Sequence, residues 1–107
     1  VPSATVRLRI GAETVQRSAW GDGPVDAAYA AISLAIGSEI KLENYAIRAI
    51  TSGSQALGEV TVHLARDEEK VRGRGVSTDV IEASARAYVD ALNRLAIKDA
   101  NEEHQTV

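Results

Sequence analysis

Two short segments of this chain bring glycine, a helix start and an aspartate together. They are Gly21-Asp22-Gly23-Pro24-Val25-Asp26 and Gly75-Val76-Ser77-Thr78-Asp79. A helix N-terminus offers unpaired backbone N–H groups and about half a positive charge, so it can hold a carboxylate. Asp26 and Asp79 are then placed to receive an ammonium group, and the pair matches the two ends of a free amino acid. In the plainer interpretation, the aspartates only complement the helix dipole and the glycines only turn the chain.

Other chemistry finds little support in the residues. The two histidines, His63 and His104, lack metal-ligand spacing. Neither Gly21-x-Gly23 nor Gly73-x-Gly75 has the third glycine of a dinucleotide-binding loop. Catalysis by this chain alone is therefore not expected, although the aspartates beside glycine loops keep a small standalone enzyme open as an alternative.

The elements that must position these residues occur twice. Thr5-Val6-Arg7-Leu8 is matched by Thr61-Val62-His63-Leu64, 56 positions later, and Gly21 is matched by Gly75, 54 positions later. Each copy is predicted to be a strand hairpin that passes through glycine into a helix. Such duplication suggests a pseudo-symmetric binding module.

The first copy is predicted from its periodicity. Apolar residues alternate with polar ones from 5 to 10, and the chain turns at Gly11-Ala12 into a second strand over 13–20. Pro24 suits the first helical position, and Gly37 suits the helix end. The apolar face between them is expected to contain Val25, Ala28, Tyr29, Ile32 and Ile36.

The second copy has three predicted strands. Residues 44–51 are expected to form a strand that is buried on both faces. A fourth strand carries alternating Val60, Val62 and Leu64, and a charged hairpin at 66–69 leads into a fifth strand at 70–75. A helix over about 78–97, capped by Ser77 or Thr78, follows. Its expected buried stripe is Val80, Ser84, Ala87, Tyr88, Ala91 and Leu95, and its expected solvated face is Glu82, Arg86, Asp90 and Arg94.

These patterns predict one α+β domain over residues 3–97, with unit one at 3–37, unit two at 43–97 and a polar, frayed tail at 98–107. The two units are pseudo-symmetric and βββα-type, and two helices pack on antiparallel sheet. The first unit lacks a counterpart of strand 44–51. We expect that strand, and a further domain, to lie upstream in a longer protein.

Composition narrows the function classes. The chain has 107 residues, no cysteine and a net charge of −3, which argues against disulfides, nucleic-acid binding and an anionic membrane surface. No leader or membrane-length apolar run is present, so a cytoplasmic location is expected. The core lacks Phe and Met, and its small residues favour a partner chain.

The motifs resemble a known family. The chain is similar, over about residues 3–97, to the C-terminal regulatory domain of 2-isopropylmalate synthases, which citramalate synthases also carry. The resemblance rests on residues 21–29, 45–53 and 56–60 and, most strongly, on Gly75 to Ser84 with Ala87-Tyr88 and Ala91-Leu92-Asn93. These motifs are specific in combination and in this order.

The resemblance implies a homodimeric domain that binds a branched-chain amino acid as feedback inhibitor. Divalent metal and acetyl-CoA chemistry would belong to an upstream (β/α)8 barrel, so no cofactor is expected in this chain. The implied effector residues are Gly21, Gly23, Pro24, Val25, Asp26, Leu42, Tyr45, Ala49, Ala56, Gly58 and Asp79. Ser77-Thr78-Asp79 resembles the isopropylmalate type, which favours leucine over the isoleucine of citramalate synthases. A purely structural dimerisation module is the other alternative.

Overall fold

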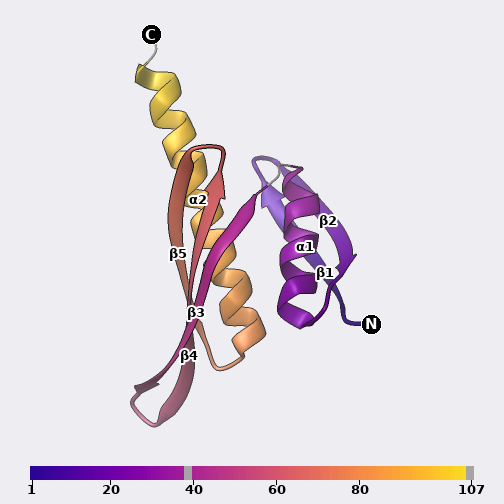
Figure 1. The fold of residues 1–107 in the computed structure, drawn as a ribbon, viewed down its shortest axis with the longest axis vertical. Helices are drawn as coiled ribbons and strands as arrows, with labels where there is room; N and C mark the ends of the chain where they lie inside the picture. The colour runs from indigo at the N-terminus through magenta and orange to yellow at the C-terminus, as the bar shows by residue number, and fades with distance from the viewer. Residues whose placement is uncertain (38–39, 106–107) are drawn as a thin grey trace. The chain divides into compact units, whose positions relative to one another are not determined.

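The computed structural model describes the backbone of residues 1–37 and 40–105, and the side chains of residues 1–37 and 40–96. The elements in order are β1 (Ser3–Ile10), β2 (Glu13–Trp20), α1 (Pro24–Ile36), β3 (Lys41–Ser52), β4 (Gln55–Arg66), β5 (Glu69–Ser77) and α2 (Val80–Gln105). They separate into two compact units, Val1–Ile40 and Lys41–Val107. Figure 1 shows a helix beside antiparallel strands in each unit. The predicted α+β class is confirmed.

The first unit is a hairpin covered by a helix. β1 and β2 pair antiparallel from Ser3↔Trp20 to Ile10↔Glu13, and Gly11 turns the chain with a φ of 63°. Its buried residues are mainly small: Ala19, Ala27, Ala28, Tyr29, Ala31 and Ile32. Small side chains let α1 approach the strands closely. The helix ends, as predicted, at Gly37, which has left-handed backbone geometry.

The second unit is the three-stranded sheet β3-β4-β5 with α2 on one face. The predicted alternation in β4 is confirmed, because Val60, Val62 and Leu64 are fully buried. Gly73 and Gly75 explain how the helix fits. A Cβ atom at either position would overlap the α2 backbone at Ala87 or Ala83. The glycines of β5 therefore serve close packing of helix on strand.

The expectation that residues 44–51 are buried on both faces is wrong. β3 lies at the edge of its sheet, paired only with β4, and most of its residues are exposed. Ile47, for example, is 52% exposed. The β4–β5 pairing stops at Gly58↔Ser77, whereas β3 and β4 stay paired out to Ser52↔Gln55. Residues 49–58 thus form a two-stranded arm that extends past β5 (Figure 1).

Helix α2 differs from its prediction at both ends. It begins at Val80, and Asp79 caps it in place of Ser77 or Thr78. It continues to Gln105, beyond the expected end at 97 and through most of the predicted frayed tail, since no glycine or proline follows Gly75. Residues 106–107 lie outside the described residues.

The side-chain stripes of α2 also differ in part. Val80, expected to be buried, is 40% exposed because it lies in the first turn beside the arm, whereas the rest of the predicted buried stripe is buried. The solvated stripe contains the ion pairs Arg86–Glu82 and Arg94–Asp90, as expected. It also reaches the edge of β5: Asp90 accepts the Arg74 backbone N–H at 2.9 Å. This stripe therefore shields a strand edge as well as facing solvent.

Candidate functional site

The start of α1 is an uncapped helix N-terminus. Gly23 is the N-cap residue, with an extended backbone (φ −146°, ψ 175°) and no side-chain hydrogen bond to the helix. Pro24, which has no N–H, occupies the first turn as predicted. A Cβ atom at Gly23 would meet nothing within 4 Å. The first amides of α1 therefore lack a side-chain acceptor, and there is room beside Gly23, which suits an anionic group.

Gly21 holds this helix start in place. Its N–H donates to the carbonyl of Pro2 at 3.1 Å, and a Cβ atom here would overlap the backbone of Asp26 and Ala27. The two glycines of the segment thus differ: Gly21 is required by packing, and Gly23 is not. Val25 is half-buried and Asp26 is exposed, one turn into the helix.

The start of α2 is closed by its own side chains. Asp79 accepts the backbone N–H of Ile81 through Oδ1 at 2.8 Å, which makes it the N-cap. Ser77 accepts the Asp79 N–H through Oγ at 3.2 Å and donates the same hydroxyl to Glu82 at 3.1 Å. The plainer interpretation therefore describes at least one role of Asp79, because one of its oxygens already serves the helix.

Small residues lie together on the arm. Ala49 pairs with Gly58, and Ala56 sits two positions along on β4, so the three share one face of the ribbon. A Cβ atom at Gly58 would lie 3.4 Å from a methyl group of Val80. Val80 and Ile81 are 40% and 43% exposed, so this part of the second unit presents an apolar surface beside the α2 start.

Tyr45 and Leu42 lie farther along β3. Tyr45 pairs with Val62, on the helix-facing side of the sheet, and its hydroxyl lies 2.8 Å from Ser84 Oγ. Ser84 in turn donates to the Val80 carbonyl at 2.7 Å. The register shifts between Leu42 and Asn44, so a β-bulge separates Leu42 from the regular part of the strand.

The implied effector residues thus fall into two groups. Gly21 to Asp26 surround the start of α1 in the first unit. Ala49, Ala56 and Gly58 share the arm face in the second unit, with Asp79 at the adjoining helix start and Tyr45 and Leu42 farther along β3. Their contact with an effector stays a prediction.

One cluster escaped the sequence reasoning. Glu59, only 9% exposed in its side chain, bonds Arg48 at 2.8 Å and the Nε of Arg74 at 2.7 Å, so a single carboxylate links all three strands. The Arg74 hydrogen bond, helped by the charges of both arginines, holds the pKa of Glu59 below its usual value. Only the strand register places Arg48, Glu59 and Arg74 side by side. The sequence shows the alternation of polar and apolar residues in these strands, but not which residues are opposite one another.

Among residues 1–37 and 40–96, no three His, Asp or Glu side chains gather in a way that would hold a metal ion. In the part of the chain that the structure describes, neither helix has the length and apolarity needed to cross a membrane.

Comparison with known proteins gives a consistent result. Residues 1–96 match the family described as the LeuA allosteric (dimerisation) domain. The 2-isopropylmalate synthases of Carboxydothermus hydrogenoformans and Heliobacterium modesticaldum are 52% and 50% identical to this chain. Each match covers 89% of this chain and 19% of the relative. That of Pyrococcus furiosus is 48% identical over 89% of this chain and 19% of the relative.

This chain therefore spans about 19% of the length of those relatives. The resemblance seen in the motifs is confirmed, and the match covers both units. The chain belongs to the LeuA allosteric (dimerisation) domain family.

Proposed function

We propose that this chain is the feedback-regulatory domain of a 2-isopropylmalate synthase and that it binds L-leucine as a homodimer. The family description and the names of the relatives support the regulatory assignment. In this proposal, an acetyl-CoA-dependent catalytic barrel with its divalent metal forms another part of a longer protein. Leucine binding inhibits that barrel by changing how the regulatory domain sits on it.

The observation that carries the proposal is the open start of α1. An uncapped N-terminus with free space at Gly23 leaves amide donors for the carboxylate of an amino acid. The exposed carboxylate of Asp26, in the same helical turn, is available to the α-ammonium group. A zwitterion thereby finds one partner of each sign at a single helix start.

The second unit has an apolar surface of its own on its arm. Ala49, Ala56 and Gly58 carry little or no side chain, so an effector methyl group can approach the backbone. Leu42 and Tyr45 add larger apolar area along the same strand. These residues together supply apolar surface within the second unit.

Calorimetric titration of the chain with leucine, isoleucine and valine tests the proposal. Leucine should bind with the highest affinity, although the margin over isoleucine is modest because moving one methyl group changes binding by only about 1–3 kcal/mol. If none of the three produces heat or a thermal shift, the effector proposal fails. Asp26→Asn, which keeps the shape of the side chain, should weaken binding by removing the partner of the ammonium group.

Two alternatives to leucine binding remain, and they are distinguished by the same titration together with sedimentation. Tighter binding of isoleucine would indicate the regulatory domain of a citramalate synthase, although the relatives reported above are all 2-isopropylmalate synthases. A dimer in sedimentation whose stability does not respond to any of the three amino acids would indicate a purely structural module.

A further inference from the structure

We propose that the second unit holds a separate binding site for a small oxyanion, a carboxylate or a phosphate, centred on Arg72. The site is a cavity of about 250 Å³ lined by Glu59, Thr61, Arg72, Arg74, Asp90 and Arg94. It lies where the sheet face opposite the buried core meets the edge of β5. The cavity shares no residue with the effector groups described above.

The acceptors in this cavity are already engaged. One Glu59 oxygen bonds Arg48 and the other bonds Arg74. Asp90 accepts the backbone N–H of Arg74 at 2.9 Å and pairs with Arg94 at 3.4 Å. Both lining carboxylates therefore have donors from the protein, and neither demands a cation from outside.

Donors, by contrast, are left over. Arg72 is exposed and has no hydrogen bond or ion pair with any residue that the structure describes. Thr61, its neighbour in the lining, likewise has no side-chain partner among the described residues. A guanidinium group offers five N–H donors in a planar fork that fits a carboxylate or phosphate through two parallel bonds. The guanidinium group of Arg72 beside the hydroxyl group of Thr61 is therefore suited to bind an oxyanion.

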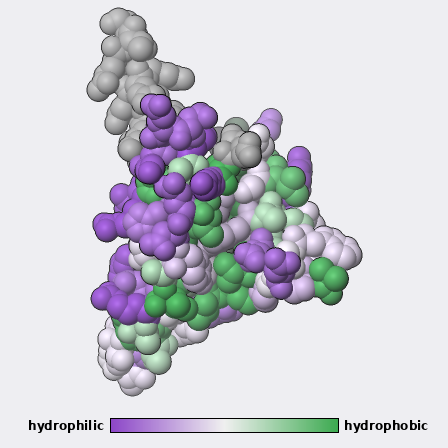
Figure 2. All heavy atoms as spheres, viewed as in Figure 1, coloured by the Kyte–Doolittle hydropathy of each residue, from purple (hydrophilic) through white to green (hydrophobic). Residues whose placement is uncertain are grey.

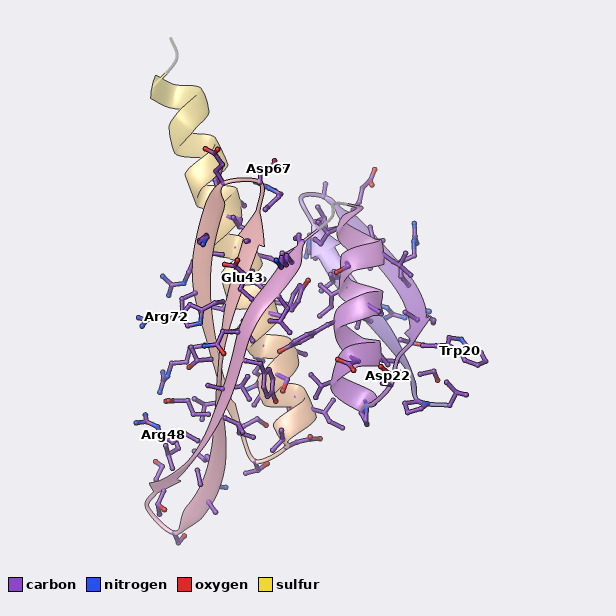
Figure 3. The ribbon with its side chains drawn as sticks, in the orientation of Figure 1. Trp20, Asp22, Glu43, Arg48, Asp67 and Arg72 are labelled. Carbon is purple, nitrogen blue, oxygen red and sulfur yellow. The ribbon has the colours of Figure 1, made fainter. Side chains whose placement is uncertain are left out.

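The local charge favours the same ligand. Four guanidinium groups, those of Arg48, Arg72, Arg74 and Arg94, meet two carboxylates here, in a chain whose net charge is −3. Figure 3 shows Arg48 and Arg72 projecting on the same side of the second unit, where Figure 2 shows hydrophilic residues gathered. The arginines bound to Glu59 and Asp90 are engaged by those bonds, so Arg72 is the guanidinium group left to bind a ligand.

The size of the cavity sets the class of ligand. Pockets for drug-sized molecules usually hold about 300–1,000 Å³. A cavity of about 250 Å³ with charged walls suits inorganic phosphate or a short carboxylic acid. We therefore commit to a free small anion and treat an acidic protein segment as an outcome of the test.

The test is an NMR titration of the 107-residue chain with sodium phosphate and, separately, sodium malonate, with sodium chloride holding ionic strength constant. Saturable shifts are expected at the backbone amides of Arg72, Gly73 and Arg74. Arg72→Gln should weaken binding of both anions about tenfold or more, because the bidentate partner is lost. Arg9→Gln is the matched control, since it removes an exposed strand arginine from the first unit.

Three results would overturn the proposal: shifts that do not saturate, equal weakening by Arg9→Gln, or saturable binding of a glutamate-rich peptide but of neither small anion. The site is independent of the proposed leucine site at the α1 start, and the variant Gly23→Asp distinguishes binding at these two sites. That variant should leave phosphate binding within about twofold of the unchanged chain. Loss of phosphate binding in Gly23→Asp would show that the anion binds at α1 instead.

Discussion

The two helix starts of this chain come from matching sequence segments and differ in how their first amides are satisfied. At α2, Asp79 accepts an amide of the helix and Ser77 supports it. At α1, Gly23 occupies the N-cap position without a side chain, so the first amides have no side-chain acceptor, and there is room beside Gly23. Side chains cap one start and leave the other uncapped, so a repeated motif need not produce two equivalent helix starts.

The largest expected effect comes from making the α1 start resemble that of α2. Gly23→Asp should abolish leucine binding, because the new carboxylate caps the free amides and repels the effector carboxylate. The extended backbone at Gly23 accepts any residue, and the space around it is open. Thermal unfolding should therefore show equal or slightly raised stability, while calorimetry shows no binding.

Gly23→Ser is the control for that variant, because it adds a cap without a charge. It should weaken leucine binding less than Gly23→Asp does. If Gly23→Asp bound leucine with unchanged affinity, the carboxylate could not lie at this helix start, and the comparison of the two starts would lose its functional meaning.

The next effect concerns packing of the same segment. Gly21→Ala should destabilise the first unit by about 1–3 kcal/mol, because the added Cβ overlaps the backbone of α1. Urea unfolding followed by the NMR signals of the β1 and β2 backbone amides reports this unit directly. Gly23→Ala meets no such overlap and should cost distinctly less; equal losses would contradict the structural distinction between the two glycines.

A smaller effect separates the two roles considered for Asp79. Asp79→Ala should cost about 0.5–2 kcal/mol of stability, since α2 loses its cap. Asp79→Asn retains an acceptor oxygen, so it should restore most of that stability while removing the charge. If leucine affinity falls in Asp79→Asn as well, the aspartate contacts the effector in addition to capping; unchanged affinity assigns it to the helix alone.

The smallest effect compares how the two sheets respond to acid. Because the pKa of Glu59 is lowered in the folded state, its contribution is present above the unfolded pKa near 4.5 and is lost as pH falls through the lower folded value. In the first unit, the cross-strand partner of Arg7 is the neutral Gln16. Acidification below about pH 4.5 should therefore destabilise the second unit, because it weakens the ion pairs of Glu59 with Arg48 and Arg74.

Hydrogen exchange measured at pH 6 and pH 3.5 checks this, with the β4 and β5 amides compared with those of β1 and β2. Glu59→Gln should remove part of the pH dependence in the second unit and leave the first unchanged. A pH response that is equal in both units, or that persists fully in Glu59→Gln, would mean that other carboxylates dominate.

Local patterns predicted most of the secondary structure, for reasons visible in single residues. Alternation through Val60, Val62 and Leu64 marks β4 because successive side chains of a strand face opposite sides. Pro24 and Gly37 mark the ends of α1 because each fixes backbone geometry locally. The exposure of Ile47 could not be predicted in this way, since it depends on β3 being an edge strand.

The properties of the candidate site can be separated in the same way, into those set by local sequence and those set by tertiary structure. The sequence by itself determined the class, the order of the elements and the family, because these depend on periodicity, turn residues and motif order. Only the tertiary structure decided which glycine is required by packing, which helix start is capped, and that Glu59 joins three strands. Those properties depend on distances between segments far apart in the chain, and such distances are set by strand register and by how closely a helix approaches its sheet.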